Sequence, residues 1–236
     1  MKTKLFINDA WIDSGDKKYF DRKHPVSGET MTQCANATVA DAGKAAQSAQ
    51  EAFKSWKAVG PSERRRLLLK VAEVMESKTP EFIKVMAKEV GASALWAGFN
   101  VHLSANVFRE AASLATQIQG ETIPTDKADT LSMTLRQPVG PILSIVPWNG
   151  TAVLAARAIA YPLVCGNTVV FKGSEFSPGT HALIAKCVQE AGLPAGVLNY
   201  LNSSPDRSPD IADALISSKE IRRINFTGSP RVGRII

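Results

Sequence analysis

The 236-residue sequence contains few of the residues that stabilise small secreted domains or hold metal ions, with only three cysteines and three histidines. Cys34, Cys165 and Cys187 show neither the arrangement of a disulfide framework nor the spacing of metal ligands. Neither a disulfide-rich domain nor a metal site is therefore expected. Each cysteine lies among apolar or small residues, which predicts three buried thiols.

Long apolar runs are also missing. The N-terminal stretch MKTKLFINDAWIDSG lacks the apolar core of a signal peptide, and Arg157 and Pro162 interrupt the best candidate for a membrane span. With 44% hydrophobic and 21% charged residues, the composition is that of a globular chain with one large core or two small ones. We expect a cytoplasmic protein without a membrane partner.

A dedicated basic surface is the third missing feature. The net charge of +6 and the pI near 9.3 would suit nucleic-acid binding, but acidic residues are interspersed with most of the basic ones. The one compact basic run, Arg64-Arg65-Arg66, follows Ser62-Glu63 at a predicted helix start, which is typical of a solvated helical face. No nucleic-acid-binding motif accompanies this run, so no nucleic-acid partner is expected.

The first half of the chain has helical spacing, from Thr38 to about Gln119. One apolar stripe recurs every three to four residues, at Ala42, Ala45, Ala49, Phe53 and Trp56. Further along, Thr79-Pro80 predicts a helix cap followed by a first-turn proline, and Gly91 is placed to end that helix. The helical pattern breaks at Gly120, after which an extended hairpin is expected up to Pro138.

From Pro138 onward, short apolar strands alternate with helices. The strand-like segments are PILSIVP, NTVVFK, GVLNYL and RRINFTG, and a helical segment follows each of them. Strands that are apolar on both faces belong in a parallel sheet covered by helices. This pattern predicts an α/β fold with a doubly wound parallel sheet, whose ligands bind beyond the carboxyl ends of the strands.

Three motifs follow predicted strands, at the edge where ligands should bind. They are Ile145-Val146-Pro147-Trp148-Asn149-Gly150, Phe171-Lys172-Gly173-Ser174-Glu175 and Phe226-Thr227-Gly228-Ser229-Pro230-Arg231-Val232-Gly233. Each motif alone would be a weak signal, because a Gly-Ser turn often caps a helix and a lysine after a strand often faces solvent. Together and in this order, they make the sequence resemble the aldehyde dehydrogenase superfamily, from the N-terminal strands to the last residue.

The resemblance implies an enzyme that oxidises an aldehyde through a thiohemiacetal on a cysteine, with hydride passing to NAD or NADP. Asn149 matches the family's oxyanion donor, an uncharged amide aimed at the negative charge that develops in the first step. Losing one such donor typically costs roughly 3 kcal/mol of transition-state stabilisation. The alternative interpretation of Asn149 is a residue that merely caps the following helix.

The resemblance also implies a Rossmann-like nucleotide-binding domain. It assigns cofactor contacts to Ile145, Val146, Pro147, Trp148, Lys172, Ser174, Glu175, Phe226, Thr227, Gly228, Ser229 and Val232. Lys172 and Glu175 match the adenosine-ribose site, where a carboxylate accepts hydrogen bonds from the ribose hydroxyls and repels a 2′-phosphate. NAD is therefore expected, with NADP as the second candidate, because Lys172 can also partner the ribose hydroxyls and so leaves some tolerance for the phosphate. A surface ion pair between Lys172 and Glu175 is the alternative interpretation.

Two departures from the family pattern concern the cofactor phosphates. Gly228 and Ser229 open a helix whose N-terminal amides suit a pyrophosphate, but Pro230 removes one backbone N–H there and predicts weaker cofactor binding. In the loop 202–209, with the sequence NSSPDRSP, many family members carry glycines near the phosphates. The sequence does not indicate what this loop contacts.

The family's nucleophilic cysteine and general-base glutamate lie after the Phe-Thr-Gly-Ser motif, so neither is expected within residues 1–236. None of the three cysteines has the glycine-rich surroundings of that nucleophile. We therefore expect the N-terminal part of a longer enzyme, truncated before its catalytic domain and inactive by itself. A finished, non-catalytic module that binds nucleotides or mediates oligomerisation is the alternative.

The resemblance divides the chain into three parts. Residues 1–119 are expected to pack as strands and helices on the cofactor-binding domain, and residues 139–236 to form an NAD-binding α/β domain that is incomplete at its C-terminus. Residues 120–138 resemble the family's oligomerisation arm. Because free edge strands seek partners, a homodimer or homotetramer of the full-length enzyme is expected.

Four further residues suggest the substrate. Gly150 stands where the family commonly has a bulky aromatic residue, and Arg157 lies roughly 10 Å further along the same helical face. Arg157 is the only charged residue of this apolar helix, so it needs an anion, a hydroxyl or an aromatic face as partner, with a structural salt bridge as the alternative. With Trp96 and Phe99 as aromatic walls, these residues favour a hydroxylated aromatic aldehyde. The resemblance ranks salicylaldehyde first, with vanillin and benzaldehyde as alternatives.

Overall fold

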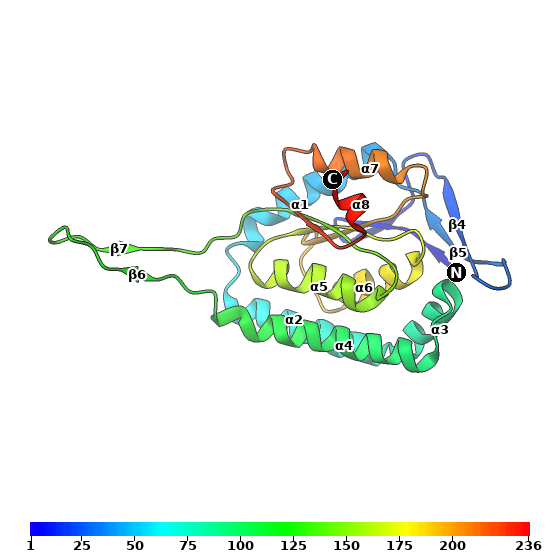
Figure 1. The fold of residues 1–236 in the computed structure, drawn as a ribbon, viewed down its shortest axis with the longest axis horizontal. Helices are drawn as coiled ribbons and strands as arrows, with labels where there is room; N and C mark the ends of the chain where they lie inside the picture. Colours follow the sequence, from blue (N-terminus) through cyan, green and yellow to red (C-terminus); the bar gives the residue numbers. More distant parts are fainter.

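The computed structural model describes residues 1–236, and a six-stranded sheet with the order β11-β8-β9-β10-β2-β3 organises it (Figure 1). Four neighbouring strands run parallel: β8 (Ile142–Ile145), β9 (Val169–Lys172), β10 (Leu198–Leu201) and β11 (Arg223–Phe226). The α/β fold with a parallel sheet, predicted from the alternation of strands and helices, is confirmed.

Both faces of the sheet are buried beneath hydrophobic cores. In β9, Val169 and Phe171 belong to the larger core and Val170 belongs to the smaller one. Successive side chains of a strand point to opposite faces, so a strand between two cores is apolar at consecutive positions. This explains the uninterrupted apolar character of the VVF stretch.

Helices form a layer on each face of the sheet, with a further layer outside one of them (Figure 1). The helices α5 (Thr151–Val164) and α6 (Pro178–Glu190) cover one face, and α1 (Val39–Trp56) and α7 (Ser208–Ile216) cover the other. The outer layer packs on α5 and α6. It contains α2 (Pro61–Ser77), α3 (Thr79–Val90) and α4 (Ala94–Ser113), which a 3-10 turn (Leu114–Thr116) continues.

The chain reverses its direction across the sheet once. It passes from β8 through α5 to β9 and through α6 to β10, whereas α7 leads back to β11 on the other side of β8. Because crossover connections are right-handed, this reversal moves α7 to the opposite face. The carboxyl ends of β8 and β11 therefore mark the switch point at which ligands bind in such sheets.

Strands from the N-terminus complete the large sheet and add a smaller one. β2 (Leu5–Ile7) pairs antiparallel with β10, and β3 (Ala10–Ile12) pairs with β2. The turn between β2 and β3 places Asn8 and Asp9 at positive φ (51° and 64°), a conformation that these two residue types tolerate. The smaller sheet contains β1 (Lys2–Thr3), β5 (Thr30–Ala35) and β4 (Tyr19–Lys23).

The ends of α1 and α3 follow local signals, with one exception. Thr38 and Asp41 form a capping box at the start of α1, and Gly91 ends α3 in the left-handed conformation, as predicted. The predicted cap at Thr79 is wrong. Only Lys78 separates α2 from α3, so Thr79 is already helical and its hydroxyl donates to the Glu76 carbonyl of the preceding helix.

The prediction of three buried thiols is confirmed for Cys34 and Cys187 and is wrong for Cys165, which is exposed. Cys165 is the residue that follows the last turn of α5. Its apolar neighbours in sequence belong to the buried face of the helix, but the chain emerges at the surface where the helix ends.

The interpretation of Arg64-Arg65-Arg66 as a solvated face is correct for the last two residues only. Arg64 is half-buried, and burial lowers its pKa. Its guanidinium lies against Gly166, where an added Cβ would be 2.5 Å from the Arg64 Nη1. Arg64 points inward because Gly166 leaves room for it.

A hairpin forms within residues 120–138. β6 (Thr122–Ile123) pairs antiparallel with β7 (Ser132–Met133), and the two strands extend as a long arm away from the helices and the sheet (Figure 1). The arm exposes the apolar side chains of Ile123, Leu131 and Met133.

None of the helices has the length and apolar character needed to cross a membrane.

Candidate functional site

Three loops at the carboxyl edge of the parallel strands carry the sequence motifs. Residues 146–150 follow β8, residues 173–177 follow β9, and residues 227–229 connect β11 to α8 (Pro230–Gly233). Since β8 lies between β9 and β11, these loops are neighbours. The Thr227 N–H donates to the Ile145 carbonyl (3.0 Å) and so joins the third loop to the first.

Asn149 lies on the first of these loops with its side chain exposed. The N-cap residue of α5 is Gly150, and no side chain forms a hydrogen bond that caps this helix. The Thr151 hydroxyl instead donates to the Trp148 carbonyl and closes the turn. The helix-cap alternative for Asn149 is therefore wrong, and its amide is available to a group from outside the helix.

Lys172, at the end of β9, is only 5% exposed. It forms no salt bridge within residues 1–236, which excludes the surface ion pair with Glu175. Burial lowers the pKa of Lys172, and the negative charge of Glu175 opposes this shift. A buried ammonium group without a close anion is unfavourable, so the environment of Lys172 suits a polar ligand.

A groove of about 470 Å³ opens beside Lys172 and Glu175, a size typical of small-molecule sites. It is lined by Ile145, Lys172, Glu175, Pro205, Ser208, Pro209, Ala212, Asp213, Ile216, Val232, Ile235 and Ile236. The structure thus brings four of the predicted cofactor residues together, namely Ile145, Lys172, Glu175 and Val232. Apolar lining residues together with a lysine and a carboxylate suit a flat ring attached to a sugar.

The other predicted cofactor residues do not line this groove. Val146 is buried, Pro147 is half-buried beside it, and Trp148 packs against Phe176 with ring centroids 5.8 Å apart. Ser174 is buried and its hydroxyl accepts from the Phe176 N–H (3.2 Å).

In the third motif, Thr227 and Gly228 are exposed, and Phe226 borders a different cavity along β11. The Ser229 hydroxyl caps α8 by accepting from the Val232 N–H (3.3 Å). Pro230 is the first residue of α8, where its missing N–H leaves one donor fewer at the helix start.

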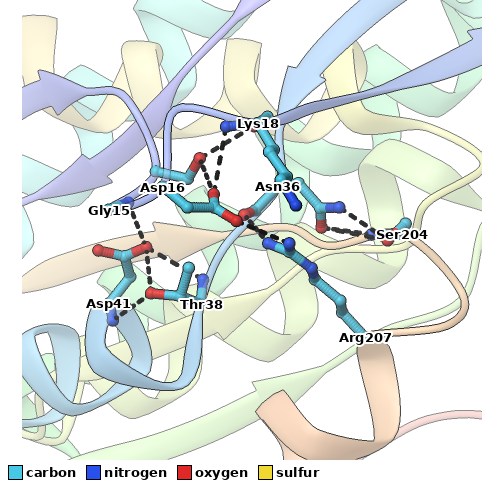
Figure 2. Close-up of polar contacts among 9 residues, drawn as sticks. Gly15, Asp16, Lys18, Asn36, Thr38, Asp41, Ser204 and Arg207 are labelled. Carbon is cyan, nitrogen blue, oxygen red and sulfur yellow. Dashed lines mark hydrogen bonds and ion pairs between the residues drawn. The ribbon is translucent and has the colours of Figure 1, made fainter.

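The loop 202–209, whose contacts the sequence did not indicate, is held by residues near the N-terminus (Figure 2). The Ser204 N–H donates to Asn36 Oδ1 (2.9 Å), and Asn36 Nδ2 donates to the Ser204 hydroxyl (2.8 Å). Arg207 donates to the Asn36 carbonyl (3.1 Å) and forms an ion pair with Asp16 (2.7 Å), which holds the pKa of that carboxyl well below its usual range. The loop then presents Pro205, Ser208 and Pro209 to the groove.

The segment that holds this loop is itself anchored on the start of α1 (Figure 2). The Gly15 N–H donates to the Asp41 carboxylate (2.9 Å), which also accepts from the Thr38 N–H (3.0 Å). Hydrogen bonds from Lys18 N–H and the Ser14 hydroxyl further fix the Asp16 carboxylate, at 3.1 Å each. One wall of the groove is thereby connected to the N-terminal segment and to α1.

Of the predicted substrate residues, Arg157 is exposed and forms no salt bridge within residues 1–236, so its salt-bridge alternative finds no partner in this part of the protein. Trp96 and Phe99 are 46% and 51% exposed, and their rings stack with centroids 5.8 Å apart. Gly150 is buried, and a Cβ there would lie 3.3 Å from both Val153 and Leu154.

The helices α4 and α5, which carry or adjoin the predicted substrate residues, lie side by side. α4 and α5 pack together, and α4 runs from the α3 end toward the arm that precedes β8 (Figure 1). Trp96 and Phe99 belong to α4, and Gly150 is the N-cap residue of α5. No cation–π contact connects Arg157 with Trp96 or Phe99 within residues 1–236.

Sequence reasoning missed two groups at this edge. The first is the groove wall of Pro205, Ser208 and Pro209, which its position after the carboxyl end of β10 could have indicated. The second is Arg22, whose guanidinium lies 5.0 Å from the centre of the Phe176 ring and donates to the Glu89 carbonyl. No local signal connects Arg22 with this loop, because the contact joins distant parts of the chain.

Comparison with known proteins shows the family to which the chain is similar. The model of the aldehyde dehydrogenase family matches residues 11–236. Salicylaldehyde dehydrogenase of Pseudomonas sp. (strain C18) is 87% identical over 236 residues, and vanillin dehydrogenase of Pseudomonas fluorescens is 50% identical over 232 residues. These matches cover 100% and 98% of this chain but 49% and 48% of the relatives. The chain spans about half the length of the curated relatives it matches.

Solved structures share the fold over the whole chain. The crystal structure of a salicylaldehyde dehydrogenase from Pseudomonas putida G7 complexed with salicylaldehyde has a TM-score of 0.99 at 88% identity, covering 100% of this chain and 49% of that one. The structure of PnpE in complex with nicotinamide adenine dinucleotide has a TM-score of 0.94 at 32% identity, covering 99% and 47%. With the family match extending over nearly all residues and the motifs at the carboxyl edge, the chain belongs to the aldehyde dehydrogenase family.

Proposed function

We propose that the full-length protein oxidises salicylaldehyde to salicylate with NAD as the hydride acceptor. The observation that carries this proposal is the identity of 87% with a salicylaldehyde dehydrogenase over the whole chain. The arrangement of the carboxyl edge supports it, because an amide, a buried ammonium and a carboxylate follow neighbouring strands there. The nucleophilic cysteine and the general base implied by the family lie outside residues 1–236.

Asn149 is the oxyanion donor in this proposal. Its amide has no role in capping α5, and the loop that carries it is fixed between the buried strand β8 and the helix. An uncharged donor held in place before the reaction stabilises a developing alkoxide without reorganisation. The side-chain amide N–H of Asn149 would donate to the aldehyde oxygen as negative charge forms on it.

Lys172 and Glu175 hold the adenosine ribose in this proposal. The buried ammonium without a salt bridge and the adjoining groove fit a sugar with free hydroxyls, and Glu175 disfavours an added 2′-phosphate. This favours NAD over NADP. The pyrophosphate would meet the loop of Gly228 and Ser229, with one N–H fewer because of Pro230. When bound, the nucleotide supplies the hydride acceptor.

In this proposal, the aldehyde substrate contacts Arg157, Trp96 and Phe99. A guanidinium without a salt bridge on an apolar helix suits an oxygen of the substrate, and the stacked rings supply aromatic surface. We propose that the Arg157 guanidinium contacts the ring hydroxyl or the ring face of bound salicylaldehyde. The glycine at position 150 keeps a large side chain away from the neighbouring reacting carbonyl.

The arm of β6 and β7 mediates assembly in this proposal. It has two unpaired strand edges and exposed apolar side chains at Ile123, Leu131 and Met133, which are features of a surface that pairs with another chain. We expect a homodimer or homotetramer, located in the cytoplasm.

Steady-state kinetics of the purified full-length protein test the function. NADH formation is followed with salicylaldehyde, vanillin and benzaldehyde, and then with NADP in place of NAD. We expect the highest kcat/KM with salicylaldehyde and NAD, with salicylate as the product. A higher value for vanillin or benzaldehyde would reassign the substrate, and nucleotide binding without any aldehyde oxidation would favour a non-catalytic module.

A further inference from the structure

The backbone of Ser174, between Lys172 and Glu175, is held from both sides by buried side chains. Its N–H donates to His181 Nδ1 (3.1 Å), and its carbonyl accepts from Asn202 Nδ2 (2.9 Å). Asn202 Nδ2 also donates to the Tyr200 hydroxyl (3.1 Å). Lys172 and Glu175, which we assign to the ribose, thus lie on either side of a residue whose backbone cannot move freely.

His181 reaches Ser174 from the first turn of α6 and is fully buried. Its ring meets Phe171 edge-on, with centroids 5.1 Å apart. Gly173 makes this approach possible, because a Cβ there would lie 2.7 Å from His181 Nδ1 and 2.9 Å from the Tyr200 ring. The His181 imidazole and the backbone of the loop 173–177 are therefore in direct contact.

The hydrogen bond defines the state of the imidazole. Nδ1 accepts, so the ring is neutral and its proton is on Nε2. Burial lowers the pKa of His181 to about 3, the nearby Thr151 backbone opposes this shift, and the Lys172 ammonium adds to it. An apolar side chain at this position would leave the buried Ser174 N–H without an acceptor, so the bond to Ser174 favours a histidine here.

We propose that His181 is a positioning residue of the nucleotide site, which fixes the Ser174 backbone so that Lys172 and Glu175 face the groove. The proposal rests on the role in nucleotide binding proposed above for these two residues. His181 itself touches neither substrate nor the reacting atoms. Its contribution is to the affinity for the nucleotide and not to the chemical step.

Two variants of nearly equal shape separate this role from packing. In His181→Asn, the amide oxygen can accept from the Ser174 N–H in place of Nδ1, whereas His181→Leu has no acceptor. The dissociation constant of NAD is measured by isothermal titration calorimetry on the full-length protein, together with kcat and KM. We expect His181→Leu to raise the Kd and KM for NAD about tenfold and His181→Asn by about threefold or less. In both variants, kcat at saturating NAD stays within about twofold of wild type.

His181→Gln provides a second comparison if His181→Leu does not fold. The amide of this glutamine is one methylene further from the backbone and misses Ser174. The His181→Gln variant should therefore bind NAD as weakly as we expect of His181→Leu. Equal affinities of the Asn variant and either of the other variants would overturn the positioning role, as would a loss of kcat equal to the loss of affinity. A wild-type protein that binds neither NAD nor NADP would instead overturn the proposed function itself.

Discussion

Replacing Arg157 by alanine should weaken the reaction with salicylaldehyde and leave the fold intact. Arg157 is exposed on α5 and has no salt bridge, so its removal breaks no ion pair within residues 1–236. Exposed substitutions of this kind usually change stability by no more than about 0.5 kcal/mol. We therefore expect an unchanged Tm, which separates this residue from a structural arginine.

The expected magnitude follows from the type of interaction. A hydrogen bond to a charged group contributes about 1.5–3 kcal/mol, which corresponds to a loss of roughly 10-fold to 150-fold in kcat/KM for salicylaldehyde. Benzaldehyde has no ring hydroxyl, so its kcat/KM should change by about twofold or less if the hydroxyl is the partner of Arg157. Comparing two enzymes with two substrates isolates the energy of this one contact.

The assay is the initial rate of NADH formation by the full-length enzyme, with Arg157→Lys as the matched control. Lysine keeps the positive charge but lacks the planar fork of the guanidinium, so an intermediate loss is expected. Equal losses on both aldehydes, accompanied by a lower Tm, would refute the contact with the hydroxyl and show that Arg157 supports the structure. Equal losses with an unchanged Tm would restrict the contact to the ring face.

Three further predictions concern the oxyanion donor, the choice of nucleotide and assembly. Asn149→Ala should lower kcat/KM by roughly 10²–10³ without lowering Tm, because the side chain does not cap α5, and a loss below about fivefold would argue against the oxyanion role. Glu175→Gln should raise kcat/KM with NADP relative to NAD by removing the repulsion of the 2′-phosphate. An unchanged ratio would contradict the assignment of Glu175. Replacing residues 121–134 by a short glycine–serine link should lower the oligomeric state measured by light scattering, and an unchanged mass would exclude the arm from the interface.

The sequence predicted from local patterns that the candidate site residues lie at the carboxyl edge. A strand that is buried on both faces is recognised by its consecutive apolar residues, and a polar residue directly after it must lie at the carboxyl edge. Lys172 and Glu175 satisfy this rule at the end of β9, and Asn149 satisfies it after β8. Their common location follows from the parallel order of the strands and needs no knowledge of distant contacts.

The parts that the sequence did not reveal depend on contacts between distant segments. The pairing of Asn36 with Ser204 joins residues 168 positions apart, and no pattern within either segment indicates the other. The role of His181 is hidden for a related reason, because a histidine in THALIAKC is compatible with any helix. Cys165 shows the limit of composition as a guide, since its exposure depends on where α5 ends.

The groups that we assign to ligand contacts differ systematically from the groups that fix the backbone beneath them. Asn149 caps no helix, and Lys172 and Arg157 have no salt bridge, whereas the backbone of Ser174 and the loop at Ser204 are fixed through buried hydrogen bonds. A free side chain on a mobile loop would lose much of its binding energy to the ordering of that loop. A free side chain on a fixed backbone keeps more of that energy. The hydrogen bonds that fix the backbone behind the carboxyl edge therefore allow the unpaired side chains at its surface to contribute to binding.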